Sequence, residues 1–326
     1  MTDPIQQTPT YRFLNFVSRQ PIQLSRFVAK ALAGLVNGLK LAKTAHTIRL
    51  NLQITLPELA TEQRERIIRE ATRNELMSYF EFFNIWGATN QKNIQRIHTV
   101  QGAELLHAAL EEKKGVVLIV PHFGTWEIMN AWVAQYTDMT IMYKPVKNEA
   151  ANHFVRQARS REQANLVPTD ETGVRQIFKA LKQGGTTVIL PDHTPHTAGE
   201  MVPYFGVPLA SSNLSAKLIQ KTKAKALLLY SLRNDHHGFD MHIEAMDDAL
   251  YQGSANQGTQ VIHHALEDLI RRYPEHYHWS YKRFKANPAL RGLYNLTTDE
   301  ALHRVAKVRA QAQADAEANA ALVDTL

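Results

Sequence analysis

A histidine and a glutamate five positions apart, His122 and Glu127, form the pair in this sequence best suited to acid–base chemistry. They lie in the segment VVLIVPHFGTWEIMNAWV, where an apolar run typical of a strand ends at Pro121 and a helical pattern begins. A carboxylate that accepts a hydrogen bond from one ring nitrogen fixes the tautomer, so the other nitrogen can take a proton from a hydroxyl. The spacing predicts His122 as a general base that Glu127 orients and charge-balances. A helix-capping histidine beside a surface glutamate is the structural alternative.

Other kinds of chemistry find little support in the sequence. The chain has no cysteine, which excludes disulfides, thiolate zinc sites, iron–sulfur clusters and a cysteine nucleophile. It also lacks the G-x-S-x-G elbow of serine hydrolases. Histidines such as His193 and His196 could serve a metal hydrolase, but none follows the H-E-x-x-H spacing. We therefore expect no metal and no cofactor.

Two further polar groups follow predicted strands. YKPVKN at 143–148 leads into a helix that carries Arg156, Arg159 and Arg161, and PDHTPH at 191–196 contains Asp192. Arginine clusters bind phosphate or carboxylate groups through bidentate hydrogen bonds, although such a cluster can also be a solvated helix face.

The elements that must position these residues alternate along the central part of the chain. Apolar runs predict buried strands at 115–121, 139–145, 186–192, 225–232 and 239–246. Helical patterns separate or follow them at 126–135, 149–163, 173–183, 211–222 and 256–272. This alternation predicts an α/β fold with a central, mainly parallel sheet covered by helices. Ligand sites of such sheets lie at the carboxyl ends of the strands, where His122 falls.

The N-terminal part of the chain has a different character. Residues 1–50 hold seven basic and one acidic side chain, which accounts for the whole net charge of +6. Residues 22–43 predict an amphipathic helix with Arg26, Lys30 and Lys40 along a narrow stripe. Such a helix suits an anionic membrane surface, and a core-packing helix is the alternative. We find no secretory signal and no apolar run long enough to span a bilayer.

These patterns divide the chain into three parts. We expect a helical N-terminal arm over 1–95, an α/β core over 96–290, and an alanine-rich tail over 291–326 that is helical or frayed.

Several motifs, taken in order, resemble a known family. They are HFGTWE, YKPVKN, Arg159, PDH, VPYFG and WSYKRF, which begin at residues 122, 143, 159, 191, 202 and 279. Their combination resembles the late acyltransferases of lipid A biosynthesis, the lauroyl/myristoyl transferase branch of the lysophospholipid acyltransferase superfamily. Glutamate in place of the more common aspartate of the H-x4-D motif favours this branch. Lys144 departs from the arginine that usually follows the tyrosine of the second motif.

The resemblance implies an acyl carrier protein thioester as donor and an acylated, phosphorylated glucosamine disaccharide, a lipid A precursor, as acceptor. His122 would be the base and Glu127 its orienting partner. Arg159 would hold an acceptor phosphate or polarise the site, and Asp192 would support the site or the substrate. Backbone donors near Phe123 and Gly124 would stabilise the oxyanion. The resemblance also implies a place at the cytoplasmic face of the inner membrane.

Two other classes of protein remain as alternatives. An acyl thioesterase would use the same base to activate water. A non-enzymatic basic protein at a membrane surface would use only the N-terminal arm. A nucleic-acid partner is not expected, because no nucleic-acid-binding motif is present.

Overall fold

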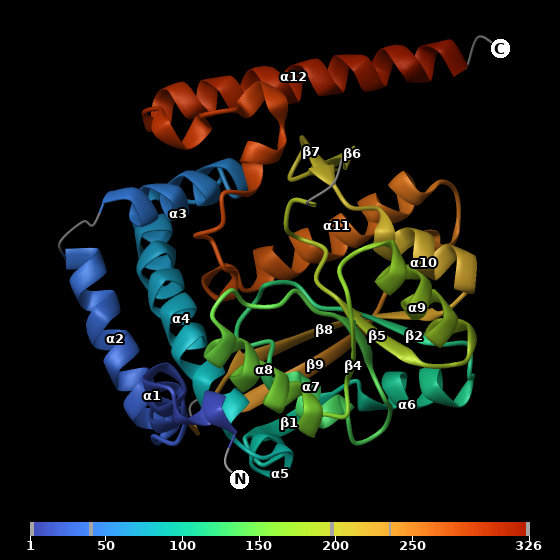
Figure 1. The fold of residues 1–326 in the computed structure, drawn as a ribbon. Helices are drawn as coiled ribbons and strands as arrows, with labels where there is room; N and C mark the ends of the chain where they lie inside the picture. Colours follow the sequence, from blue (N-terminus) through green and yellow to red (C-terminus); the bar gives the residue numbers. More distant parts are fainter. Residues whose placement is uncertain (1–2, 39–41, 196–198, 235, 324–326) are drawn as a thin grey trace.

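A five-stranded sheet forms the centre of the computed structural model, which describes residues 3–38, 42–195, 199–234 and 236–323 (Figure 1). The strand order is β1 (Ile97–Gln101), β9 (Phe239–Ala245), β8 (Lys225–Arg233), β2 (Val116–Ile119) and β5 (Thr186–Ile189). Only the β8–β9 pairing is antiparallel. The predicted α/β fold with a mainly parallel sheet is therefore confirmed.

Two small sheets accompany the central one. The predicted strand at 139–145 is β3 (Thr140–Met142), which pairs with β4 (Asn165–Val167) in parallel. The segment 200–211, which has the composition of a Pro/Gly-rich loop, instead forms an antiparallel hairpin of β6 (Glu200–Tyr204) and β7 (Val207–Ser211).

The buried side chains of the central strands alternate between two hydrophobic clusters. Along β2, Val117 and Ile119 join one cluster, whereas Val116 and Leu118 join the other. This two-residue period is that of a strand buried on both faces. Helices cover both faces of the sheet, and β2 is therefore a continuous apolar run in the sequence.

Helices cover both faces of the sheet (Figure 1). Between residue 90 and residue 272 they are α5 (Asn90–Ile94), α6 (Ala103–Glu111), α7 (Ile128–Val133), α8 (Glu149–Arg161), α9 (Glu171–Lys182), α10 (Leu214–Thr222) and α11 (Ala255–Arg272). The tail contains α12 (Thr298–Val323), whose later turns extend away from the rest of the molecule (Figure 1). The first turns of α12 bury Ala301 and Val305, and Arg309 donates to the carbonyls of Ile54 and Phe205, each at 2.7 Å.

Four α-helices come before α5 in the described chain: α1 (Pro9–Ser18), α2 (Ile22–Gly38), α3 (Ala42–Thr55) and α4 (Thr61–Gly87). The helix predicted over 22–43 therefore corresponds to α2 and the start of α3, and residues 39–41 between them, including Lys40, lie outside the described part of the chain. Helix α4 is the longest of the four.

Beyond Ile22 and Arg26, the residues that helix α2 buries are small ones. Ser25, Ala29 and Ala33 face α4, and their size allows the two helices to approach closely. Arg26, predicted on a solvent-facing cationic stripe, is buried among them and pairs with Glu81 of α4. The large apolar side chains of α2 remain exposed on its opposite side. Among the described residues, no helix is long and apolar enough to cross a membrane.

Candidate active site

The turn between β2 and α7, residues 120–127, is fixed by close backbone contacts. The N–H of Gly124 donates to the carbonyl of His276 at 2.8 Å. Gly124 has a φ of +54°, and a Cβ there would lie 2.5 Å from the carbonyl oxygen of Ser231. Only glycine fits this position without moving the neighbouring strand. The turn thus has one well-defined path, which sets where its side chains point.

His122 is oriented by Asp192, which follows the neighbouring parallel strand β5. The imidazole Nδ1 lies 2.8 Å from Oδ1 of Asp192, and the His122 backbone N–H donates to Oδ2 at 3.1 Å. The carboxylate is fully buried, whereas the His122 side chain is 20% exposed. Among the described residues, Nε2 of His122 has no hydrogen-bond partner. A carboxylate on Nδ1 and a free Nε2 form the arrangement of a general base.

Charge and stacking tune this pair. Burial alone would raise the pKa of Asp192, but the charges of His122 and His193 and the hydrogen bonds from His122 hold it well below its usual range. The His193 ring stacks on that of His122 with centroids 3.6 Å apart, and on that of Tyr281 at 3.7 Å. Burial lowers the pKa of His193 to about 4. Asp192 is therefore ionised and His193 neutral near pH 7.

The same residues are the candidate metal ligands among the described part of the chain. His122, Asp192 and His193 offer ligand atoms within 4.8 Å of one another. A bound ion lies in the plane of each imidazole that ligates it. The two rings are parallel, with an interplanar angle of 0°, so their planes share no point at which one ion could bind both. The arrangement fits an orienting pair better than a metal centre. His196 lies outside the described residues.

Glu127 makes a different set of contacts from the one predicted. Nη2 of Arg159 donates to both carboxylate oxygens of Glu127, at 2.7 and 2.6 Å, and Trp86 Nε1 donates at 2.8 Å. Arg159 also binds Glu162 at 3.0 Å through Nη1. No hydrogen bond joins Glu127 to His122 among the described residues. The carboxylate that contacts the base directly is Asp192, because the sheet places β5 beside β2.

The Glu127–Arg159–Glu162 cluster is nearly closed to solvent. Burial would lower the pKa of Arg159, but the charges of Glu127 and Glu162 raise it above its usual value. Burial raises the pKa of Glu162 to about 7 against the opposing effect of Arg159. One guanidinium is therefore shared between two carboxyl groups, and little of its charge is left for a third partner.

The backbone donors expected near Phe123 and Gly124 are already engaged. The N–H of Phe123 donates to the carbonyl of Pro121 at 2.8 Å, and that of Gly124 donates to His276. These two amides are not free to stabilise an oxyanion, so the donors predicted near this turn would be other groups, and their identity stays a prediction. The tight turn that presents His122 consumes them.

A buried polar cluster behind the turn was not predicted. Glu81 of α4 receives hydrogen bonds from Arg233 at 2.9 and 3.0 Å, from Arg26 at 2.5 Å and from Thr125 at 2.5 Å. Arg233 also donates to Ser78 and to Thr125, at 2.6 and 2.8 Å. Such pairing is required because an isolated buried charge is costly. The only sequence signal was Glu81 itself, an acid within an aromatic helix segment.

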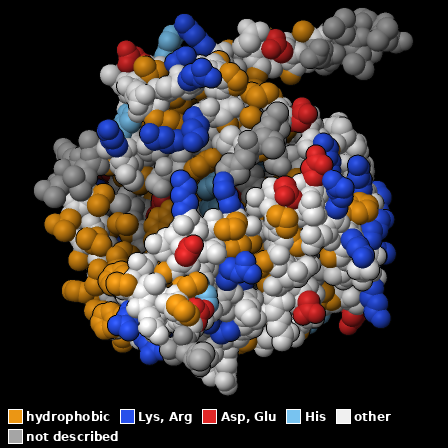
Figure 2. Space-filling model, viewed as in Figure 1, with side chains coloured by type: hydrophobic (Ala, Val, Ile, Leu, Met, Phe, Trp, Pro, Cys, Tyr) orange, Lys and Arg blue, Asp and Glu red, His pale blue; other side chains and the backbone are white. Residues whose placement is uncertain are grey.

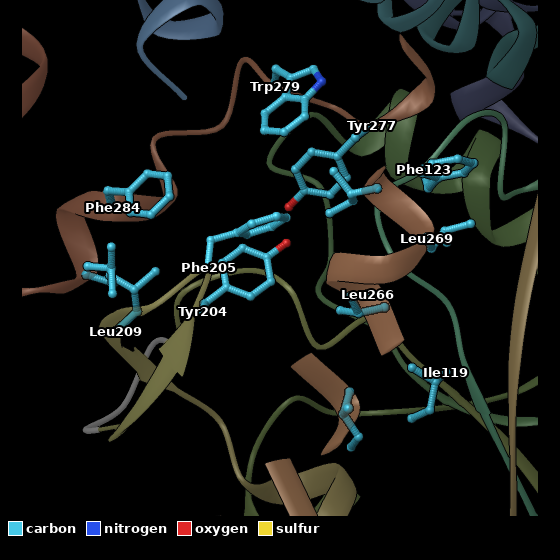
Figure 3. Close-up of a cluster of buried hydrophobic side chains, with 14 of the residues drawn as sticks. Ile119, Phe123, Tyr204, Phe205, Leu209, Leu266, Leu269, Tyr277, Trp279 and Phe284 are labelled. Atoms are coloured by element: carbon cyan, nitrogen blue, oxygen red, sulfur yellow. The ribbon is translucent and has the colours of Figure 1, made fainter. Parts of the chain in front are cut away.

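Figure 2 shows a hollow near the centre of this face, with a histidine side chain visible between Lys or Arg side chains. Aromatic residues of the segment after α11 pack against the residues of the candidate site. Tyr277 donates to Asp192 at 3.2 Å, and in Figure 3 its hydroxyl points toward that of Tyr204 on the β6–β7 hairpin.

Together these features define a class of protein. An oriented imidazole with a free nitrogen at the carboxyl end of a parallel strand is an arrangement that can remove a proton from a substrate group, and it is typical of α/β enzymes.

Comparison with known proteins narrows this class. The chain belongs to the bacterial lipid A biosynthesis acyltransferases, a family it matches over residues 11–286. It is 25% identical over 243 residues to the lipid A biosynthesis palmitoleoyltransferase of Escherichia coli, covering 74% of this chain and 78% of that one. It is 22% identical over 249 residues to the lauroyltransferase of the same organism, covering 76% and 80%. A lipid A biosynthesis acyltransferase of Haemophilus influenzae is 25% identical over 273 residues, covering 82% and 86%. The protein is thus an acyltransferase of lipid A biosynthesis.

Proposed function

We propose that this protein transfers a fatty acyl chain from acyl carrier protein to the hydroxyl of a 3-hydroxyacyl chain on a lipid A precursor. The observation that carries the proposal is the His122–Asp192 pair, whose imidazole is 20% exposed and keeps Nε2 free of hydrogen bonds to the described residues. A base without a neighbouring nucleophile suits direct activation of the acceptor hydroxyl.

In the proposed reaction, Nε2 of His122 takes the hydroxyl proton as the hydroxyl oxygen attacks the thioester carbonyl carbon. Asp192 stabilises the imidazolium that forms, since it already binds Nδ1. The tetrahedral intermediate then collapses and the carbon–sulfur bond breaks. The imidazolium returns the proton to the leaving thiolate, so the products are the ester and the free thiol of the carrier.

Glu127 and Arg159 have a supporting role in this proposal. Their ion pair, extended by Glu162, joins α8 to the residue that precedes α7. They would hold the turn at 120–127 in the conformation that presents His122. Because Glu127 and Glu162 balance its charge, we assign Arg159 to this architecture rather than to an acceptor phosphate.

We further propose that α1 and α2 bind the cytoplasmic face of the inner membrane. Their exposed side is apolar, and hydrophobic side chains gather over these helices in Figure 2. The exposed residues are Phe13, Phe16, Leu24, Phe27, Val28, Leu32 and Leu35. An apolar helix face with flanking cations suits the interface of an anionic bilayer.

The direct test is an assay of the purified protein with candidate acyl carrier protein thioesters and lipid A precursors, read by mass spectrometry. We expect one added acyl mass on the precursor and release of the free carrier. Hydrolysis of the thioester without acylation of any precursor would instead identify a thioesterase. Membrane binding without either reaction would identify the non-enzymatic alternative.

A further inference from the structure

If the protein acylates a phosphorylated acceptor, as proposed above, it needs cationic side chains that are not already paired with carboxylates. Arg159, the arginine among the family motifs, is 12% exposed and is bound to two carboxylates. Other basic side chains close to His122 are therefore required.

A wide groove with such side chains lies between the start of α3, the loop at 282 and the turn before α12. Its volume is about 760 Å³. Three of its lining residues are basic, Lys43, His46 and Lys282, and none of those that the structure describes is acidic. The adjacent carboxylate of Glu300 accepts hydrogen bonds from Thr297 as the cap of α12. The groove thus offers a positive surface to an anionic group.

The groove begins one residue from the stacked rings of the site. Lys282 directly follows Tyr281, whose ring stacks on His193, which in turn stacks on His122. Lys282 is held near the groove wall by its ammonium, 5.6 Å from the ring centroid of Tyr294. The Lys282 end of the groove is therefore next in sequence to the ring stack that ends at His122.

An apolar pocket of about 240 Å³ lies on the other face of α3. Its walls include Val36, Ile48, Leu76 and Tyr79, together with Ser280 of the same loop. The acid among its described lining residues, Glu75, accepts hydrogen bonds from Ser280 and Tyr79, and burial raises its pKa. This wall is therefore compatible with a hydrocarbon chain.

This pocket also approaches the base. The Tyr79 ring contacts that of His278 with centroids 5.5 Å apart, and His278 contacts Trp126 at 5.0 Å. Trp126 in turn contacts the His122 ring at 5.0 Å. Helix α3 and the loop 280–282 consequently lie between a cationic groove and an apolar pocket, and a series of ring contacts connects the neighbourhood of each with His122.

We propose that α3 and the loop 280–282 form a two-part subsite for an amphiphilic acceptor that carries a phosphoryl group and a fatty acyl chain. The phosphoryl group binds in the groove against Lys43, His46 and Lys282. An acyl chain of the same molecule enters the pocket between Ile48, Leu76 and Tyr79.

The phosphoryl part is tested with Lys282→Gln and Lys43→Gln, and Lys217→Gln on α10 is the matched control because it is an exposed lysine outside the groove. Transfer is measured with a phosphorylated lipid A precursor and with the same precursor after enzymatic dephosphorylation. We expect each groove variant to raise the acceptor KM about tenfold for the phosphorylated precursor only, the effect of losing one charge-assisted contact. The kcat value and donor hydrolysis should stay unchanged.

Three outcomes would overturn this part. Equal acceptor KM values in Lys282→Gln and the control would exclude the groove. An equal rise with the dephosphorylated precursor would exclude phosphoryl recognition. A rise in KM for the acyl carrier protein thioester instead would assign the groove to the phosphate of the donor arm.

The chain part is tested with Leu76→Trp, which fills the pocket, and Leu105→Trp on α6 is the control because it is also half-buried. We expect Leu76→Trp to lower kcat/KM about tenfold for precursors with long acyl chains and less for short-chain analogues. Equal loss for all chain lengths, with an unchanged melting temperature, would exclude a chain in this pocket. Binding of the phosphorylated precursor without donor separates the inference from the proposed function. Binding that depends on Lys282 supports the subsite even if no transfer occurs, and equal binding by Lys282→Gln refutes it.

Discussion

The turn at 120–127 carries two ionisable side chains, His122 near its start and Glu127 at its end, and their surroundings differ. At one end His122 binds the buried carboxylate of Asp192 and keeps one nitrogen free. At the other end Glu127 is tied to Trp86 and to Arg159, which also binds Glu162. The first arrangement can exchange a proton with a ligand. The second has its hydrogen bonds satisfied within the protein.

This contrast separates chemistry from architecture within one short motif. An ion pair in which both partners are buried is costly to break, and it fixes the elements that supply its members. A base must keep one face open. The H-x4-E spacing thus joins a reactive residue to a structural clamp, and the orienting carboxylate comes from another strand.

Replacing His122 should have the largest effect. We expect His122→Ala to lower acyl transfer on the order of 10⁴-fold, because no other group can accept the hydroxyl proton. The melting temperature should fall only modestly, because the buried Asp192 carboxylate loses the imidazole but keeps the residue-122 backbone N–H and Tyr277 as hydrogen-bond donors. Steady-state assays with mass spectrometry measure the first effect and calorimetry the second. Transfer at the wild-type rate by a folded variant would refute the proposed base.

Replacing Asp192 tests the open end of the turn. We expect Asp192→Asn to reduce kcat on the order of 10²–10³-fold, because the imidazolium loses its counter-charge and the tautomer is no longer fixed. The acceptor KM should change much less. If kcat stayed within about threefold of wild type, Asp192 would not be the orienting group and a water-mediated role of Glu127 would regain support.

Replacing Arg159 tests the closed end. Lysine cannot reproduce a guanidinium shared by two carboxylates, so Arg159→Lys should lower transfer and donor hydrolysis together by about tenfold and reduce the melting temperature. Both reactions and thermal unfolding are measured on one preparation. A loss of transfer alone, with donor hydrolysis intact, would instead support an acceptor-phosphate role for Arg159.

Acidification should destabilise the site before it changes the fold elsewhere. Burial lowers the pKa of His193 to about 4 and those of His276 and His278 to about 3, against 6.5 for a free imidazole. The unfolded chain therefore binds more protons below pH 6.5, and stability falls as the pH drops from there toward about 4. Each such imidazole contributes up to about 1.4 kcal/mol per pH unit. Denaturant unfolding between pH 7 and pH 5 measures the slope, and a flat profile would contradict these buried neutral states.

The smallest effect concerns the exposed face of α2. Phe27→Ser removes an apolar side chain that is 69% exposed and contacts no core cluster, so folding and activity in detergent should be unchanged. Binding to anionic vesicles should fall about fivefold, because an aromatic side chain that is only partly buried at the membrane interface contributes about 1 kcal/mol. The matched control is Tyr136→Ser, which removes another exposed aromatic side chain, just after α7 and outside α1 and α2. Equal vesicle binding by both variants would place the membrane contact elsewhere.

Much of the fold was predictable because the signals are local. The apolar runs at β2, β5, β8 and β9 have the length and composition of buried strands, and the intervening helices have their own periodicity. The β6–β7 hairpin was not predictable, because it turns on Phe205 and Gly206, both with positive φ, within a Pro/Gly-rich segment. The segment 274–285 falls within the predicted core, but its packing against the turn at 120–127 is a tertiary contact that its local sequence does not indicate.

The sequence by itself determined that a histidine follows a buried strand and begins a turn to a helix, since both depend on neighbouring residues. It could not decide which carboxylate that histidine meets. Asp192 is 70 positions away, and it reaches His122 only because β5 pairs with β2 in parallel. Nor could periodicity decide which face of α2 is buried, because small residues that fit against α4 outweigh larger ones left exposed. Local patterns fix local structure, whereas partners distant along the chain are chosen by strand order and helix packing, which are properties of the whole fold.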